Sequence, residues 1–196
     1  LNAVGGSALW LEGGIDATSS VTAKDVAIAG SVKGINVVGA LAGSLTVSGG
    51  SITTTSAEAV YLTAAVAGKI LVSKATVSSA GAHGITFAAD LSGSLTVQRS
   101  ALSAATGNGV QLDTLTGGSV RFAGGTLGGS IAAVKIVGAA NAASSVRLGN
   151  VAATGTASHC VWAVGAFSGS LSIAGGSVVT GGNAVHFDAD TSKNAI

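Results

Sequence analysis

The stretch Gly84–Ser103, GITFAADLSGSLTVQRSALS, decides the fold of this chain. Apolar residues alternate with small or polar ones in three short segments, which begin at Ile85, Leu95 and Leu102. A period of two is typical of a β-strand with one buried face, whereas a helix gives a period near 3.6. The stretch therefore predicts three short strands separated by bends, and one such unit cannot bury its apolar side alone.

The same pattern recurs along the whole chain. Equivalents of Ile85 follow one another at intervals of 24 to 27 residues, by subtraction of their positions. The first column is Leu9, Ile35, Val60, Ile85, Val110, Val134, Val161 and Val185; a loop column is Ile15, Leu41, Val66, Leu91, Leu115 and Phe167; a last-strand column is Ile28, Ile52, Val77, Leu102, Leu127 and Val178. Self-similarity at this period is the signature of a solenoid.

We therefore predict an all-β fold, a parallel β-helix of about eight coils of about 25 residues with three short strands each. Parallel crossovers favour a right-handed path. Residues 1–196 are expected to form a single β-helix domain. The chain starts at Leu1 and ends at Ile196 part-way through a coil, so we expect a fragment of a longer solenoid whose uncapped ends permit self-association.

Composition narrows the possible partners. The formal net charge of +1 gives no reason to expect that the protein binds nucleic acid. Although 47% of residues are hydrophobic, Lys135 interrupts the longest apolar run, so we expect no membrane span in this segment. The single cysteine, Cys160, excludes an internal disulfide and is interpreted as a small residue at a tight corner. No cofactor is expected.

Two units, LTVSGGSITTTSAEAVYL at 45–62 and LVSKATVSSAGAHGITF at 71–87, carry a family resemblance. They resemble the passenger repeats of pertactin-like autotransporters, in which a strand, a Gly-rich bend and a Thr/Ser strand lead to the next coil. The resemblance implies a right-handed β-helix exposed on a Gram-negative cell surface, commonly an adhesin or a stalk. Because the resembling motif is structural, it carries over no functional residue.

Four basic residues are expected on one edge of four consecutive coils. Lys74 and Arg99 share one column, and Arg121 and Arg147 share another on the outer side of the second strand. Like charges on neighbouring strands repel, and guanidinium groups suit carboxylate, sulfate or phosphate. The strip predicts a site for an acidic polysaccharide or another anionic ligand. The alternative is four solvated charges that keep a charge-poor surface soluble.

Asp90 and Asp113 are the candidate catalytic residues. They follow the first strand in adjacent coils, offset by two positions, so their backbones should lie roughly 8 Å apart. Inverting glycosidases place two carboxyl groups at a comparable separation. Asp is also an ordinary turn residue, and no aromatic platform flanks the pair.

The outward column after the first apolar position contains the aromatic candidates. It reads Trp10, Asn36, Tyr61, Thr86, Gln111, Lys135, Trp162 and His186. Trp162 and His186 are expected to be ladder neighbours that stack on a sugar or bury at an interface, unless a loop or a neighbouring chain covers them. His159 and His186 should lie about 10 Å apart along the strand, so no metal site is predicted.

The leading hypothesis is an extracellular or bacterial-surface β-helix that is structural or adhesive and non-enzymatic. Its partners would be a host-surface or matrix protein, or an acidic glycan. The alternatives are a polysaccharide-processing β-helix enzyme, a hydrolase or lyase, and the subunit of a filament stacked end to end.

Overall fold

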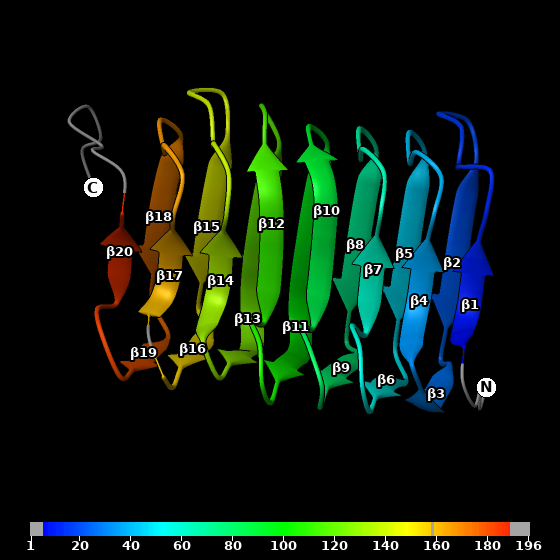
Figure 1. The fold of residues 1–196 in the computed structure, drawn as a ribbon, viewed down its shortest axis with the longest axis horizontal. Helices are drawn as coiled ribbons and strands as arrows, with labels where there is room; N and C mark the ends of the chain where they lie inside the picture. The colour runs from blue at the N-terminus through cyan, green and yellow to red at the C-terminus, as the bar shows by residue number, and fades with distance from the viewer. Residues whose placement is uncertain (1–5, 158, 189–196) are drawn as a thin grey trace.

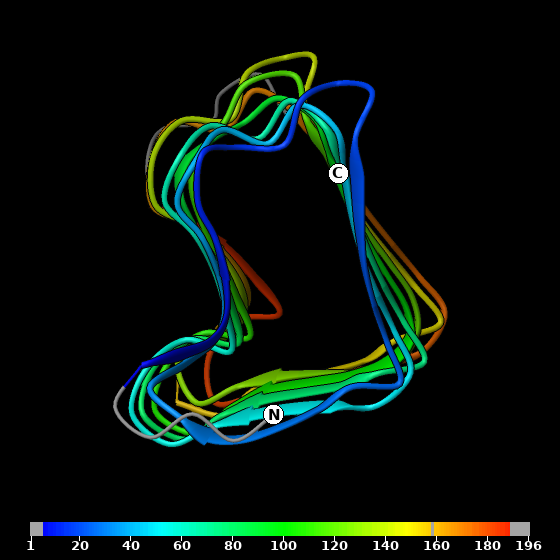
Figure 2. The same cartoon turned by 90° about the vertical axis from the view of Figure 1, so that its right-hand side faces the viewer.

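The computed structural model describes residues 6–157 and 159–188, and within them the chain forms parallel strands and no helix. The strands stack coil upon coil along one axis, with β1 and β20 at opposite ends (Figure 1). Seen along the axis, the coils overlie one another and enclose a continuous interior (Figure 2). The predicted all-β solenoid is confirmed, with about seven complete turns where the sequence predicted about eight. Over the described ranges, no helix has the length and apolarity needed to cross a membrane.

One eight-stranded sheet is built from the first strand of every coil. Its members, in spatial order, are β1 (Ser7–Leu11), β4 (Lys33–Val37), β7 (Val60–Leu62), β10 (Ile85–Leu91), β12 (Val110–Leu115), β14 (Ala132–Ile136), β17 (His159–Ala163) and β20 (Val185–Phe187). The register pairs Ile85 with Val60 on one side and with Val110 on the other. The predicted first column is therefore the observed one.

The second and third strands of the coils join into a twelve-stranded sheet. The second strands are β2 (Ser20–Lys24), β5 (Ser44–Ser48), β8 (Lys69–Ser73), β11 (Ser94–Ala104), β13 (Ser119–Gly129), β15 (Ser145–Gly149) and β18 (Ser170–Ala174). The third strands are β3 (Ala27–Ser31), β6 (Ser51–Thr54), β9 (Thr76–Ser79), β16 (Ala152–Gly155) and β19 (Ser177–Thr180). β11 and β13 each continue through the corner, so that one strand serves as both the second and the third strand of its coil. The ladder of second strands and the ladder of third strands are thereby joined into one sheet.

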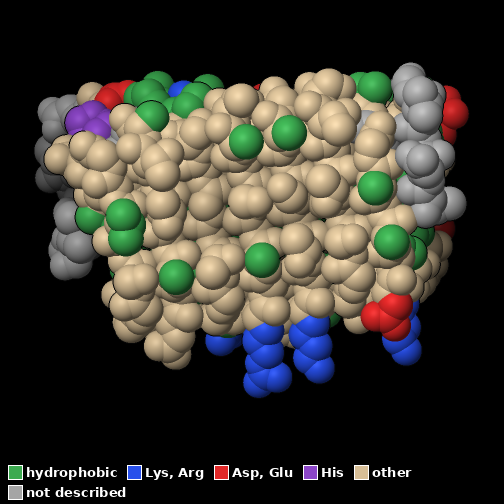
Figure 3. Space-filling view, turned by 90° about the horizontal axis from the view of Figure 1, so that it is seen from below, with side chains coloured by type: hydrophobic (Ala, Val, Ile, Leu, Met, Phe, Trp, Pro, Cys, Tyr) green, Lys and Arg blue, Asp and Glu red, His purple; other side chains and the backbone are tan. Residues whose placement is uncertain are grey.

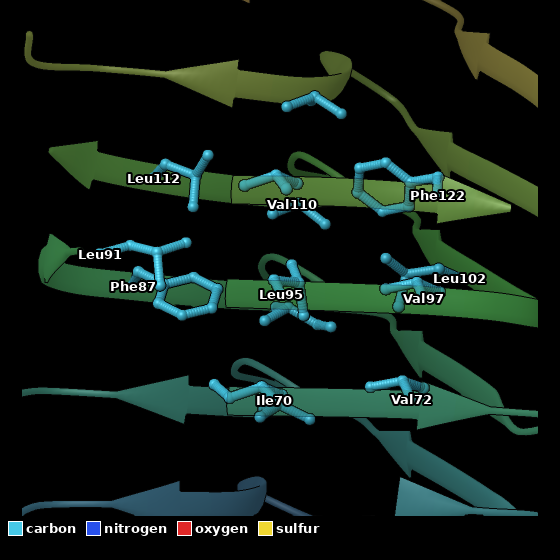
Figure 4. Packing of buried hydrophobic residues seen from close by; sticks show 14 of the residues in the cluster. Ile70, Val72, Phe87, Leu91, Leu95, Val97, Leu102, Val110, Leu112 and Phe122 are labelled. Carbon is cyan, nitrogen blue, oxygen red and sulfur yellow. The ribbon is translucent and has the colours of Figure 1, made fainter. Parts of the chain in front are cut away.

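Inward side chains stack in rows along the axis. Ile70 and Leu95 form part of one row, and Val72, Val97 and Phe122 form part of another (Figure 4). Two rows contain alanines that the sequence columns left blank: Ala140 lies between Leu115 and Phe167, and Ala153 lies between Leu127 and Val178. Cys160 is fully buried, and burial raises the pKa of its thiol to about 11, in keeping with a packing role.

The corner between the second and third strands has two forms. In one form a Gly–Gly pair takes positive φ at both positions, as at 49–50, 124–125 and 175–176. In the other a non-glycine residue takes the left-handed conformation alone, and these residues are Asp25, Lys74, Arg99 and Asn150. Two side chains of the second form lie over a glycine corner of the next coil: a Cβ on Gly49 would come 2.1 Å from Asp25 Oδ1, and one on Gly175 would come 2.2 Å from Asn150 Oδ1. Glycine pairs therefore leave room for the preceding corner.

Candidate functional site

The four predicted basic residues line one hollow in the surface. Its volume is about 580 Å³, and Lys74, Arg99, Arg121 and Arg147 all contribute to its lining. All four side chains are exposed. Viewed over the third strands, most of the lysine and arginine side chains in view project along one edge of the molecule, whereas the face itself carries few charged side chains (Figure 3). The sequence placed these residues on one edge, and the structure adds the hollow between them.

The hollow exists because the residues between the cations are small. Arg121 and Arg147 are register partners on β13 and β15, and both point outward. Two residues further on, the outward positions in these coils are Ala123 and Gly149, which also pair with each other. Long side chains thus surround positions that carry almost no side chain. No Asp or Glu is among the described residues that line this basic groove.

Lys74 and Arg99 occupy strained positions at the edge of the groove. Their φ values are 53° and 49°, in the left-handed region where a side chain costs roughly 1–2 kcal/mol. Equivalent corners use glycine at Gly49, Gly124 and Gly175. Asp and Asn tolerate this conformation, but Lys and Arg have no such advantage. Strain of this kind tends to collect at functional positions.

Replacing Arg99 with glycine is expected to raise the free energy of unfolding by about 0.5–1 kcal/mol, because the relief of left-handed strain exceeds the entropic cost of glycine. Urea denaturation followed by circular dichroism measures the change. Gln98→Gly is the matched control, because Gln98 lies within a strand without positive φ, and there glycine should be destabilising. An Arg99→Gly variant less stable than the wild type would contradict the strain argument.

The acidic pair is offset by one position instead of the two that the sequence indicated. A register shift between Phe87 and Asp90 pairs Asp90 with Thr114, so Asp113 lies one residue from the partner position. A β-bulge inserts the extra residue that a count along the sequence cannot reveal. The Asp90 carboxylate accepts hydrogen bonds from the backbone N–H of Thr116, at 3.1 Å, and from its hydroxyl. Asp90 thereby ties its coil to the next one.

The aromatic candidates are ladder neighbours, as predicted: Trp162 pairs with His186 on one side and with Lys135 on the other. Trp162 is nevertheless engaged within the chain. Lys135 Nζ lies 4.1 Å from the centre of its ring, and its Nε1–H donates to Asp188 Oδ2 at 2.9 Å. A sugar that stacks on this indole would have to displace the lysine or compete with His159, whose ring packs edge-on at 5.4 Å.

His159 and His186 lie much closer together than expected. Their ring centroids are 4.2 Å apart and the planes are nearly parallel, at 19°, whereas their positions along the strand indicated about 10 Å. The predicted offset of three residues along the strand is confirmed, since Trp162 is the register partner of His186. The rings meet because side chains of this length span that offset. His186 Nε2 lies 2.7 Å from Asp188 Oδ1. Within the part of the chain that the structure describes, no group of three or more His, Cys, Asp or Glu residues could hold a metal ion.

A polar relay that the sequence reasoning missed begins at His83. The backbone N–H of Asn108, one coil further, donates to His83 Nδ1 at 2.9 Å. The Asn108 side-chain amide then donates to Gln111 Oε1 at 3.0 Å, and Gln111 Nε2 lies 3.5 Å from Asp113 Oδ1. Because Nδ1 accepts a hydrogen bond, the relay requires an unprotonated imidazole at His83.

The same relay recurs near the C-terminal end. Asn183 N–H donates to His159 Nδ1 at 3.1 Å, and the Asn183 amide lies 3.4 Å from His186 Nδ1, with His186 bound to Asp188. The two relays share the heptapeptide pattern GNGVQLD at 107–113 and GNAVHFD at 182–188. That repeated motif, together with a His 24 or 25 residues before each Asn, is the signal that could have found them.

Acidification is expected to destabilise the protein through His83. Burial, followed by a smaller effect of Lys135, lowers the pKa of His83, while Glu58 and Asp113 oppose the shift. The unfolded chain therefore binds this proton more readily. The free energy of unfolding should be level above about pH 6.5 and should fall as the pH drops below it. Urea denaturation at pH 7.5 and pH 5 measures the difference. The difference should shrink in His83→Gln, and an unchanged difference would contradict the assignment.

Comparison with known proteins identifies no relative: no family model, no curated protein and no solved structure matches this chain. The resemblance to pertactin-like autotransporter passengers accordingly stays a prediction from the repeat pattern. The geometry is therefore the evidence on function: the basic groove brings four cations together, and the residues of the two relays are not part of its lining.

Proposed function

We propose that the protein is a non-enzymatic, extracellular or cell-surface solenoid that binds an acidic polysaccharide in its basic groove. The observation that carries the proposal is the convergence of four cations, without a carboxylate, on one hollow of about 580 Å³. A charge-assisted hydrogen bond contributes about 1.5–3 kcal/mol, and arginine offers paired donors that fit carboxylate and sulfate. Solvated charges would not need a shared cavity, and Lys74 and Arg99 would not need strained corners.

The test is the double variant Arg121→Ala/Arg147→Ala, with heparin and polygalacturonate as probes. Loss of two charge-assisted contacts should weaken binding by about 100-fold, and the wild-type affinity should fall with added salt. Lys24→Ala/Lys69→Ala is the control, because it removes the same charge from residues outside the groove. Equal binding by the wild type and both double variants would refute the proposal.

The two other hypotheses stay open as predictions. A polysaccharide-processing enzyme would need a second carboxyl group beside Asp90, and the bonds from Thr116 already engage that carboxylate. For a filament, the relevant feature is the C-terminal coil, where Ile173 of the inward column is 38% exposed.

A further inference from the structure

The cations of the basic groove are spaced one per coil. Lys74, Arg99, Arg121 and Arg147 belong to four consecutive coils, because β8, β11, β13 and β15 are successive neighbours in the sheet. Coils stack about 4.8 Å apart, so the four charges span roughly 14 Å along the axis. A compact ion such as phosphate would meet one or two of them. A linear chain with one anionic group per monomer, lying along the axis, would meet all four.

The floor of the groove forms a straight row in the same direction. Register pairs Ser73 with Gln98, then Ala123, Gly149 and Ala174, and every one of these lines the groove. This row lies two residues after Arg121 and Arg147 and one residue before the corner that holds Lys74 and Arg99. The two cation pairs therefore flank the row on opposite sides.

The floor has both polar and apolar parts. At one end Gln98 Nε2 lies 3.3 Å from Ser73 Oγ, and these groups can exchange hydrogen bonds with hydroxyls. At the other end the alanine and glycine positions present methyl groups and bare backbone. A sugar carries hydroxyls and C–H faces as well as its anionic group, whereas polyphosphate has only the charges. The combination favours an acidic saccharide over a purely ionic polymer.

Gly149 keeps this floor open. It ends β15 without positive φ, and a Cβ at this position would meet only the Phe122 carbonyl oxygen, at 3.7 Å. Neither backbone conformation nor crowding requires a glycine there. By contrast, a Cβ on Gly125 would come 2.2 Å from Ser100 O, so that glycine is required by the corner. The missing side chain at Gly149 therefore adds space to the groove.

We propose that the groove holds an acidic oligosaccharide running along the solenoid axis over the row from Ser73 to Ala174, and that Gly149 determines which chains fit. This inference rests on the proposed function and adds the direction in which the ligand lies and a specificity-determining residue. Galacturonate oligomers of one to eight units are the probes. Affinity should rise with length up to about four or five units, which match the charged coils, and then level off.

Gly149→Val is the decisive variant, because it fills the floor and leaves every cation in place. It should weaken binding of the pentamer at least tenfold and leave the stabilisation by sulfate ions in thermal unfolding unchanged. Gly149→Ala should have a smaller effect of the same sign, and it serves as the test if the valine variant fails to fold by circular dichroism.

The outcomes separate this inference from the proposed function. If Arg121→Ala/Arg147→Ala loses binding while both Gly149 variants bind the pentamer as the wild type does, the polyanion function stands and the inference is overturned. Polyphosphate binding tighter than the pentamer, or affinity independent of length, would also overturn it. If the wild type binds no polyanion, the proposed function and this inference are both overturned.

Discussion

The Gly125→Val variant is expected to lose about 3–5 kcal/mol of stability and to be largely unfolded at 37 °C. Gly125 has a φ of 89°, a conformation that a β-branched residue strongly disfavours. In addition, its new Cβ would lie 2.2 Å from Ser100 O and 2.8 Å from Ser100 N. These are backbone atoms of the neighbouring coil, so relief requires the two coils to separate.

Gly149→Ala is the matched control, because its Cβ would meet one atom at ordinary contact distance. It should be neutral or slightly stabilising, since glycine weakens a strand. Urea denaturation of both variants, followed by far-ultraviolet circular dichroism, provides the comparison. A Gly125→Val protein that unfolds with the wild-type midpoint would show that the corner is plastic, against the geometry described above.

The Phe87→Ala variant should cost about 3–5 kcal/mol, the usual range for removing a buried aromatic ring. Phe87 is 1% exposed, and its register partners in the row are Leu62 and Leu112. Figure 4 shows its ring among the inward side chains. Because each row continues through all coils, the cavity would weaken contacts on both sides. The free energy of unfolding from urea titration measures the loss.

Trp10→Ala provides the contrast for the core substitution. Trp10 belongs to the outward column and is 58% exposed, so its removal should change stability by about 0.5 kcal/mol or less. Comparable losses for Trp10→Ala and Phe87→Ala would mean that the inward and outward faces have been assigned incorrectly.

The strand order and register could be predicted from the repeat, because large apolar residues such as Ile85 and Leu95 mark their columns clearly. The inward positions of Ala140 and Ala153 could not be predicted in this way, because alanine also occurs on the outer face and does not mark a buried column. The offset of Asp90 was wrong because a bulge adds a residue to one strand without changing the sequence pattern.

The site was predictable only in part. Lys74, Arg99, Arg121 and Arg147 could be placed on one edge because columns follow directly from the period. The floor of the hollow contains Ala123 and Gly149, whose small size is not distinctive in a sequence rich in small residues. The stacking of His159 on His186 depends on side-chain conformation, which no column count contains.

The serial arrangement of coils has a mechanical consequence. Strands of each sheet pair with their counterparts one coil away, and β1 and β20 lie at opposite ends of the stack (Figure 1). Tension applied along the axis therefore loads the inter-coil hydrogen bonds one layer at a time, beginning at the ends. Each released coil of about 25 residues lengthens the chain by roughly 80 Å. The molecule would therefore extend in steps under load, one coil at a time, while the remaining coils keep their structure.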